Sequence, residues 1–310
     1  MRDTFVRTLL DMARKDPRIL VVTGDLGFGV LKPFWQALPH QILNAGIAEQ
    51  NMTSVAAGLA LEGKTVFTYS IGNFPTLRCL EQIRNDCAYH GANVKIVCVG
   101  GGFVYGSLGV SHHATEDIAV MRALPDVKVF APGDLMEAEA VTRALPGIPG
   151  TCYLRLGRGG EKRIHATLPD FQLGKALAIQ PGEKIALFST GGIFDEVSKA
   201  AQLLKESGIQ PAVWTFPTVK PMDRETVLQC ARQFDCIVTC EEHNILGGFG
   251  SAVAEVLCER RSKARLLRIG LNDTYGRLVG NQSYLRAQYG IDAESIARKA
   301  LAFLNEGDMA

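Results

Sequence analysis

The chain has 310 residues, of which 47% are hydrophobic and 21% are charged, and its formal net charge at pH 7 is +1. These values indicate a soluble globular protein near the size at which one core divides into two. A charge so close to zero does not favour nucleic-acid or membrane binding, and no apolar run approaches the ~20 residues that a membrane-spanning helix needs.

The first half of the sequence alternates between strands and helices. The charged segment that opens it, MRDTFVRTLLDMARKDPR, lacks the apolar block of a signal peptide, so we expect a cytoplasmic protein. Apolar strands are predicted at 19–25, 64–70, 93–102, 127–134 and 151–157, and helices at 76–90 and 135–145. This alternation predicts a mostly parallel sheet that helices cover on both faces.

One helix of this half contains an unusual carboxylate. The stretch GIAEQNM, Gly46 to Met52, continues as TSVAAGLAL, so residues after Glu49 are nearly all small or apolar. Apolar residues on every face predict a helix that is buried on all sides, with Glu49 at its N-terminal end. An acid that only starts the helix, favoured by the helix dipole, is the simpler alternative.

A polar, glycine-rich connector at 157–183 ends this pattern, and the alternation then restarts. Strands are predicted at 184–190, 210–216, 235–242 and 264–270, and helices at 194–208 and 249–260. The predicted fold class is therefore α/β, with two doubly wound, mostly parallel sheet domains. We place the domains at 1–165 and 183–310, joined by a linker at 166–182.

Ligands of open α/β sheets bind beyond the carboxyl ends of the strands. In the first half, these ends contain acidic, aromatic, imidazole and guanidinium groups, which suit a cofactor or substrate cleft: Asp25, Tyr69, Phe74, His112, His113 and Arg158. The glycine runs have neither GxGxxG spacing nor a P-loop lysine, so a nucleotide site is poorly supported. The eight cysteines form no CxxC pair and are expected to be buried, reduced thiols.

Three segments of the first half resemble the pyrimidine-binding domain of transketolases. They are DPRILVVTGDLG, NAGIAEQNMTSVAAGLALEGKTVFTYS and SHHATEDIAVMRALPDVKVFAPGD, and TCEEHNILGGFGSAV in the second half is similar to the transketolase C-terminal domain. Deoxyxylulose-phosphate synthase and the beta subunits of 2-oxo acid dehydrogenase E1 enzymes share this architecture. The short chain resembles most closely the C-terminal half of a split transketolase.

The resemblance implies thiamine diphosphate as the cofactor, which the family binds between two domains. The family holds the diphosphate through a metal, Mg²⁺ or Ca²⁺, with a GDG motif, and no GDG occurs in these 310 residues. We therefore expect a partner subunit, the diphosphate-binding N-terminal half, to supply that site. A heterotetramer with two of each subunit is expected, and no metal ligands are assigned to this chain.

By the same resemblance, Glu49 matches the glutamate that bonds ring nitrogen N1′ of the aminopyrimidine and shares its proton. His112 matches the active-site histidine, which binds substrate hydroxyls or moves protons, and the adjacent His113 is a weaker substrate-binding candidate. Phe74, with Tyr69 as the alternative, is expected to stack on the pyrimidine. Asp25 matches an acidic residue that approaches the cofactor. A turn residue, a loop histidine or a core aromatic remains the alternative at these positions.

The predicted function is ketol transfer between sugars, by a transketolase that is active only with its partner. The alternatives are an E1 beta subunit acting on a 2-oxo acid, an enzyme like deoxyxylulose-phosphate synthase, and a non-catalytic α/β module. Enzymes of the family that use sugar phosphates commonly bind the phosphate with residues of the loop ahead of the histidine and with an arginine after the fifth strand. Here, no cation lies between Lys95 and His112, but Arg158 is present. Either Arg158 holds a terminal anion of the substrate with help from the partner subunit, which we favour, or the substrate has no such group.

Overall fold

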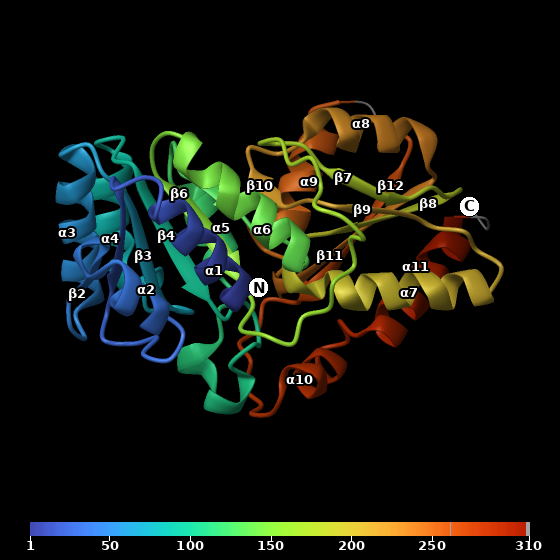
Figure 1. Cartoon of the computed structure of the whole chain (residues 1–310). Coiled ribbons are helices and arrows are strands. Elements are labelled where there is room, and N and C mark those ends of the chain that lie inside the picture. Colours follow the sequence, from blue (N-terminus) through green and yellow to red (C-terminus); the bar gives the residue numbers. More distant parts are fainter. Residues whose placement is uncertain (261, 308–310) are drawn as a thin grey trace.

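The computed structural model describes residues 1–260 and 262–307, and it contains two α/β domains that lie side by side (Figure 1). Each domain has one mostly parallel sheet with helices on both faces, which confirms the predicted fold class. No helix within the described residues is both long enough and apolar enough to cross a membrane.

The N-terminal sheet has seven strands in the order β10-β5-β6-β4-β3-β1-β2. All neighbours in it are parallel except β10 and β5. The strands are β1 (Ile19–Thr23), β2 (Ile42–Asn44), β3 (Thr65–Ile71), β4 (Val94–Val99), β5 (Lys128–Phe130), β6 (Cys152–Leu156) and β10 (Thr218–Lys220).

Successive residues of these strands pack into different cores because side chains alternate across a sheet. Val21 faces a core with Phe5 and Val141, whereas Val22 faces one with Met52 and Ile118. The helices of this domain are α1 (Arg2–Ala13), α2 (Lys32–Ala37), α3 (Glu49–Leu61), α4 (Leu80–Gln82), α5 (Asp117–Ala123) and α6 (Leu135–Ala144). The helix predicted over 76–90 is found as one continuous helical run over 77–88, which changes in type from the 3₁₀-helix η2 (Leu77–Cys79) through α4 to the π-helix η3 (Ile83–Ala88).

The C-terminal sheet has five strands in the order β12-β11-β8-β9-β7, of which only β7 is antiparallel to its neighbour. Its strands are β7 (Leu177–Gln180), β8 (Ile185–Ser189), β9 (Ala212–Thr215), β11 (Cys236–Asn244) and β12 (Arg265–Leu271). Its helices are α7 (Phe194–Glu206), α8 (Arg224–Gln233), α9 (Phe249–Cys258), α10 (Gln282–Gln288) and α11 (Ala293–Gly307). Strand β7 lies inside the predicted linker, so part of that connector belongs to the second sheet.

Strand β10 crosses from the second half of the chain into the first sheet. Thr218 pairs with Phe130 of β5, and the N–H of Ala131 donates to the carbonyl of Pro217 at 2.9 Å. The N–H of Gly191 in turn donates to the carbonyl of Ala131 at 2.8 Å. Backbone hydrogen bonds therefore join the two domains, and the second half completes the first sheet.

A buried carboxylate also joins the domains. Glu242, near the end of β11, is 2% exposed, and its Oε1 accepts a hydrogen bond from the backbone N–H of Phe103 at 2.6 Å. Its Oε2 accepts from Nε of Arg286 at 2.7 Å, and Nε2 of Gln282 donates to both oxygens. Phe103 belongs to the loop after β4, so this network holds a loop of the first domain against α10 of the second.

We predict that Glu242→Ala lowers the free energy of unfolding by about 3–5 kcal/mol, because it removes the nearer carboxylate partner of the buried Arg286 guanidinium and leaves only the longer contact with Glu196 at 3.5 Å. Urea denaturation of the purified chain measures this change. Glu255→Ala is the control, since Glu255 is 61% exposed in its pair with Arg122 and should contribute less than about 1 kcal/mol. Equal losses in the two variants would contradict the role of the buried network.

Candidate active site

Glu49 is the first residue of α3, and its side chain is 3% exposed. Its Oε2 accepts a hydrogen bond from Nη1 of Arg78 at 2.7 Å, and its Oε1 has no hydrogen-bond partner among residues 1–260 and 262–307. Gly24, directly after β1, lies so close that an added Cβ would be 3.4 Å from Cγ of Glu49. The site thus presents a buried carboxylate at the carboxyl edge of the parallel sheet.

Helix α3 itself is not buried on all sides, so that prediction is wrong for the chain alone. Met52, Thr53 and Ala56 are buried, whereas Asn51 and Leu61 are exposed. The exposed residues of α3 are both polar and apolar, namely Gln50, Asn51, Gly58 and Leu61, and Val55 and Leu59 are half-buried beside them.

Asp25 lies beside this edge and pairs with Asn44, the last residue of β2. Its backbone has a positive φ of 55°, its N–H donates to Oδ1 of Asn44 at 2.9 Å, and its Oδ1 accepts from Nδ2 of Asn44 at 3.0 Å. Oδ1 of Asn44 also accepts from the N–H of Gly46, three residues before Glu49. Asp25 therefore helps to hold the turn that leads into α3.

Phe74 and His112 lie in contact at the same edge. Phe74 is half-buried in the loop after β3, and its ring centroid is 5.2 Å from that of His112 in an edge-on arrangement. The guanidinium carbon of Arg78 lies 4.6 Å from the centroid of Phe74, so Arg78 contacts both Phe74 and Glu49. Three residues far apart in sequence, Glu49, Phe74 and His112, are thereby brought into one cluster.

His112 ends the short turn η5 (Val110–His112) and is half-buried. Its Nδ1 lies 3.0 Å from Oγ of Ser111. Burial, and to a smaller extent the neighbouring His113, lower the pKa of His112. The neutral ring therefore predominates at pH 7 and can accept a proton or a hydrogen bond.

Arg158 continues the cluster on the far side of His112. It is exposed, and its guanidinium carbon lies 5.3 Å from the ring centroid of Tyr105, whose ring is 6.4 Å from that of His112. Arg155 is different, because it is buried and its Nε donates to Oδ2 of Asp117 at 2.8 Å.

Two candidates face the interior instead. Tyr69 is 3% exposed and stacks on Phe5, with the ring centroids 6.4 Å apart. His113 is 1% exposed, its Nε2 lies 3.2 Å from the carbonyl oxygen of Gly106, and its ring meets that of Phe103 edge-on. In this chain, both side chains are part of the packing below the site.

Sequence reasoning missed Arg78 and Tyr105, which connect the predicted residues. Arg78 could have been noticed, because it follows Phe74 by four residues in FPTLR and is the cation nearest to it in sequence. Tyr105 gave no such signal, since a single tyrosine in the glycine-rich loop after β4 is equally compatible with packing.

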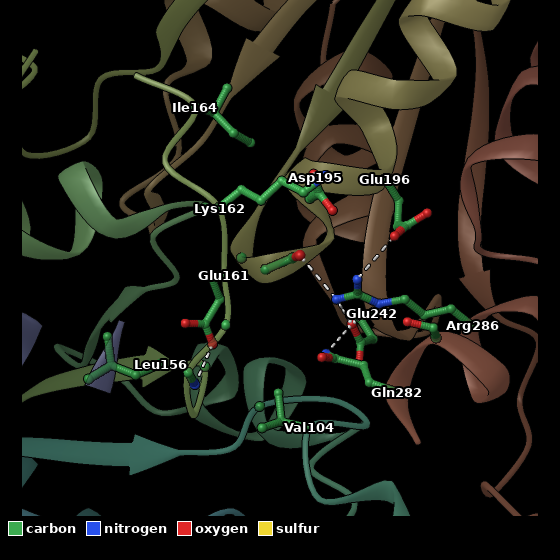
Figure 2. A pocket seen from close by; sticks show the side chains of 18 of the residues that line it. Val104, Leu156, Glu161, Lys162, Ile164, Asp195, Glu196, Glu242, Gln282 and Arg286 are labelled. Carbon is green, nitrogen blue, oxygen red and sulfur yellow. Dashed lines mark hydrogen bonds and ion pairs between the residues drawn. The ribbon is translucent and has the colours of Figure 1, made fainter. Parts of the chain in front are cut away.

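A cavity of about 170 Å³ lies between the domains and is not lined by Glu49, Phe74 or His112 (Figure 2). Its charged groups neutralise one another: Arg286 pairs with Glu242 and Glu196, and Lys199 pairs with Asp195. Because these charged groups pair with one another, few are left to bind a ligand. The cavity is better explained as part of a polar interface between the domains.

Asp134, Glu137 and His165 place their ligand atoms within 4.8 Å of one another. The oxygens of Asp134, however, accept hydrogen bonds from four backbone N–H groups, those of Met136, Glu137, Ile164 and His165. Glu137 accepts from Gly133 and meets Nε2 of His165 at 2.7 Å. These groups tie the connector to α6 and have few lone pairs left for a metal ion.

Comparison with known proteins identifies the two domains. The transketolase pyrimidine binding domain matches residues 1–160, and the transketolase C-terminal domain matches residues 174–296. One of the subunits of the apulose-4-phosphate transketolase of Phocaeicola vulgatus is 36% identical over 98% of this chain and 97% of its own. The 6-deoxy-6-sulfo-D-fructose transketolase subunit SqwH of a Clostridium species is 37% identical over 97% and 93%.

A solved structure described as a split gene transketolase, an inactive beta4 tetramer, is 34% identical, covers 97% of both chains and has a TM-score of 0.87. The family model and the relatives therefore cover nearly the whole chain in the predicted order of domains. The chain belongs to the transketolase family, with the pyrimidine-binding domain followed by the C-terminal domain.

Proposed function

We propose that this chain is the pyrimidine-binding subunit of a split, thiamine-diphosphate-dependent transketolase, which transfers a ketol unit between sugars. One observation carries the proposal: the buried carboxylate of Glu49 lies within reach of the half-buried ring of Phe74, and His112 contacts that ring. A carboxylate, a flat aromatic surface and a neutral imidazole are the groups that a pyrimidine ring and a sugar carbonyl require together.

The residues present fit the pyrimidine half of the cofactor. Glu49 offers a carboxylate oxygen, Oε1, without a hydrogen-bond partner among the described residues, and Phe74 offers a ring to stack on. When bound, thiamine diphosphate supplies the carbon nucleophile that takes up the ketol unit. Glu49 would hold a proton at ring nitrogen N1′, while Asp25 maintains the turn that positions Glu49.

His112 would act on the sugar. Because its lowered pKa keeps the ring neutral, it can accept a hydrogen bond from a substrate hydroxyl or remove its proton. Its contact with Phe74 would place the imidazole beside the ring on which the cofactor stacks. The interior positions of Tyr69 and His113 favour Phe74 and His112 for the contacts with cofactor and substrate.

The diphosphate and its metal, Mg²⁺ or Ca²⁺, require another chain, because the GDG motif is absent from this sequence. A partner subunit would supply both, and the exposed face of α3 suits burial in such a complex. The beta4 tetramer of the related split transketolase is described as inactive, which supports the need for a partner. We propose a heterotetramer with two of each subunit. A cytoplasmic location is supported by the free thiols of seven cysteines, which are Cys79, Cys87, Cys98, Cys152, Cys230, Cys240 and Cys258.

The test of this function is reconstitution. We expect the purified chain alone to have no ketol-transfer activity, because it lacks the diphosphate site. Co-purification with a short GDG-containing transketolase subunit from the same genome should give activity that depends on thiamine diphosphate and a divalent cation. Thiamine-dependent activity of the single chain at a normal rate would refute the split arrangement, and mass measurement of the complex tests the heterotetramer.

Within the reconstituted enzyme, Glu49→Ala should reduce turnover by roughly a hundred- to a thousand-fold, the usual effect of removing one critical polar group from an active site. Steady-state kinetics at saturating cofactor measures the loss. Glu62→Ala is a matched control, since Glu62 is exposed at the other end of α3 and should leave turnover unchanged. Retention of more than about a tenth of the turnover in Glu49→Ala would show that the assigned role is wrong.

Arg158 is proposed to hold a terminal anion of the substrate, and the relatives that act on a phosphorylated and a sulfonated sugar support an anionic group. Arg158→Ala should raise KM for an anionic sugar by about ten- to a hundred-fold, from the loss of a charged hydrogen bond. KM for a neutral analogue should hardly change. Arg163→Ala is the control, because Arg163 donates to carbonyls of its own loop. Equal effects on both sugars would exclude anion recognition by Arg158.

A further inference from the structure

Arg78 contacts Glu49 and Phe74, the two side chains that are proposed to bind the pyrimidine ring of the cofactor. Its Nη1 lies 2.7 Å from Oε2 of Glu49, and its guanidinium carbon lies 4.6 Å from the ring centroid of Phe74. The guanidinium is planar, donates hydrogen bonds and stacks on aromatic faces. An aminopyrimidine shares these properties, so one side chain of the free chain makes the two contacts that the ring would make.

We propose that Arg78 occupies the binding position of the aminopyrimidine in the cofactor-free protein and leaves this position when the cofactor binds; this inference rests on the proposed function. A ring that both bonds Glu49 and stacks on Phe74 must lie on the side of Phe74 that faces Glu49. The guanidinium of Arg78 lies there, and two flat groups cannot occupy that position together. Binding of the cofactor is therefore an exchange of one partner of Glu49 for another.

The burial of Glu49 explains why its carboxylate needs a partner when no cofactor is bound. At 3% exposure, its carboxylate is almost fully removed from water, and a buried charge without a partner is costly. Thr53 does not satisfy it, because its hydroxyl donates to the backbone carbonyl of Glu49 rather than to the side chain. Arg78 is the partner that the described residues provide for the carboxylate.

Arg78 is also placed so that it can leave. Its side chain is 46% exposed, and within the described residues that side chain forms its hydrogen bond with Glu49 and its ring contact with Phe74. It belongs to the short turn η2, between the exposed Leu77 and the buried Cys79, so the guanidinium can move into solvent without disturbing the core. The cofactor replaces both contacts that Arg78 gives up.

The consequence is measurable, because removing Arg78 destabilises the free state and spares the bound state. In the complex of the full chain with its partner subunit, Arg78→Ala should lower the Tm of the cofactor-free form by about 5 °C. Glu49→Gln should abolish this effect, since a neutral amide does not need the guanidinium. Arg84→Ala is the matched control, because Arg84 is exposed and its side chain donates a hydrogen bond to its neighbour Asn85.

The decisive measurement is the affinity for thiamine diphosphate with Mg²⁺, by isothermal titration calorimetry. By linkage, Arg78→Ala should bind the cofactor about ten-fold more tightly than the wild type, and saturating cofactor should restore its Tm to the wild-type value. Arg78→Lys keeps the charge but loses the planar stack, so its Kd should lie between the two. A purely structural role for Arg78 would weaken binding or leave it unchanged.

Unchanged or weaker binding by Arg78→Ala, with normal binding by the wild type, overturns the inference and leaves the proposed function intact. Absence of cofactor binding by the wild-type complex refutes the proposed function and this inference with it. If the alanine variant does not fold, Arg78→Lys decides alone: a lower Kd than the wild type supports the exchange, and an equal or higher Kd contradicts it.

Discussion

The arrangement of the site depends on the hydrogen bonds that the buried carboxylate of Glu242 accepts. It accepts hydrogen bonds from the loop after β4 and from α10, so the second domain holds that loop in addition to the backbone hydrogen bonds that its first residues, Gly100 and Gly101, donate to Leu156 of β6. The same loop continues through Tyr105 to His112. Because a buried carboxylate is stable only when its lone pairs are satisfied, the docking of the domains and the shape of this loop are one structural event.

The parallel sheet explains why the candidate residues meet. The carboxyl ends of parallel strands lie at one edge, and Asp25, Phe74 and Arg158 follow β1, β3 and β6 there. The start of α3 and the end of η5 bring Glu49 and His112 to the same edge. A linear series of contacts results, in which Arg78 joins Glu49 to Phe74 and Tyr105 joins His112 to Arg158. Their catalytic roles remain predictions.

Burial gives the residues of this edge different properties. Glu49 is enclosed and requires a partner, whereas Arg78 and Arg158 reach solvent and can exchange partners. His112 is half-buried, which keeps it neutral, while His113 next to it packs inside. A site with one enclosed acid and solvent-exposed cations is suited to exchange a protein contact for a ligand contact.

The sequence by itself determined the two α/β domains, the family, and the strand ends at which the site would lie, because apolar alternation and short motifs are local properties. It predicted that Glu49, Phe74, His112 and Arg158 follow strands or begin or end short helices, as the structure has them, and it predicted a helix where η2, α4 and η3 form one helical run. Periodicity could not show that α3 has an exposed face, since it does not reveal which face a second chain covers.

Only the tertiary structure decided which side chains touch. The pairing of Glu49 with Arg78 and the insertion of β10 into the first sheet join residues that are distant in sequence. The inward orientation of His113, beside the half-buried His112, depends on the backbone conformation of the loop. Strand β10 has only three residues, too few for a pattern, and gains its stability from pairing with β5. Such contacts depend on the sum of long-range packing and hydrogen bonding, which local propensity does not contain.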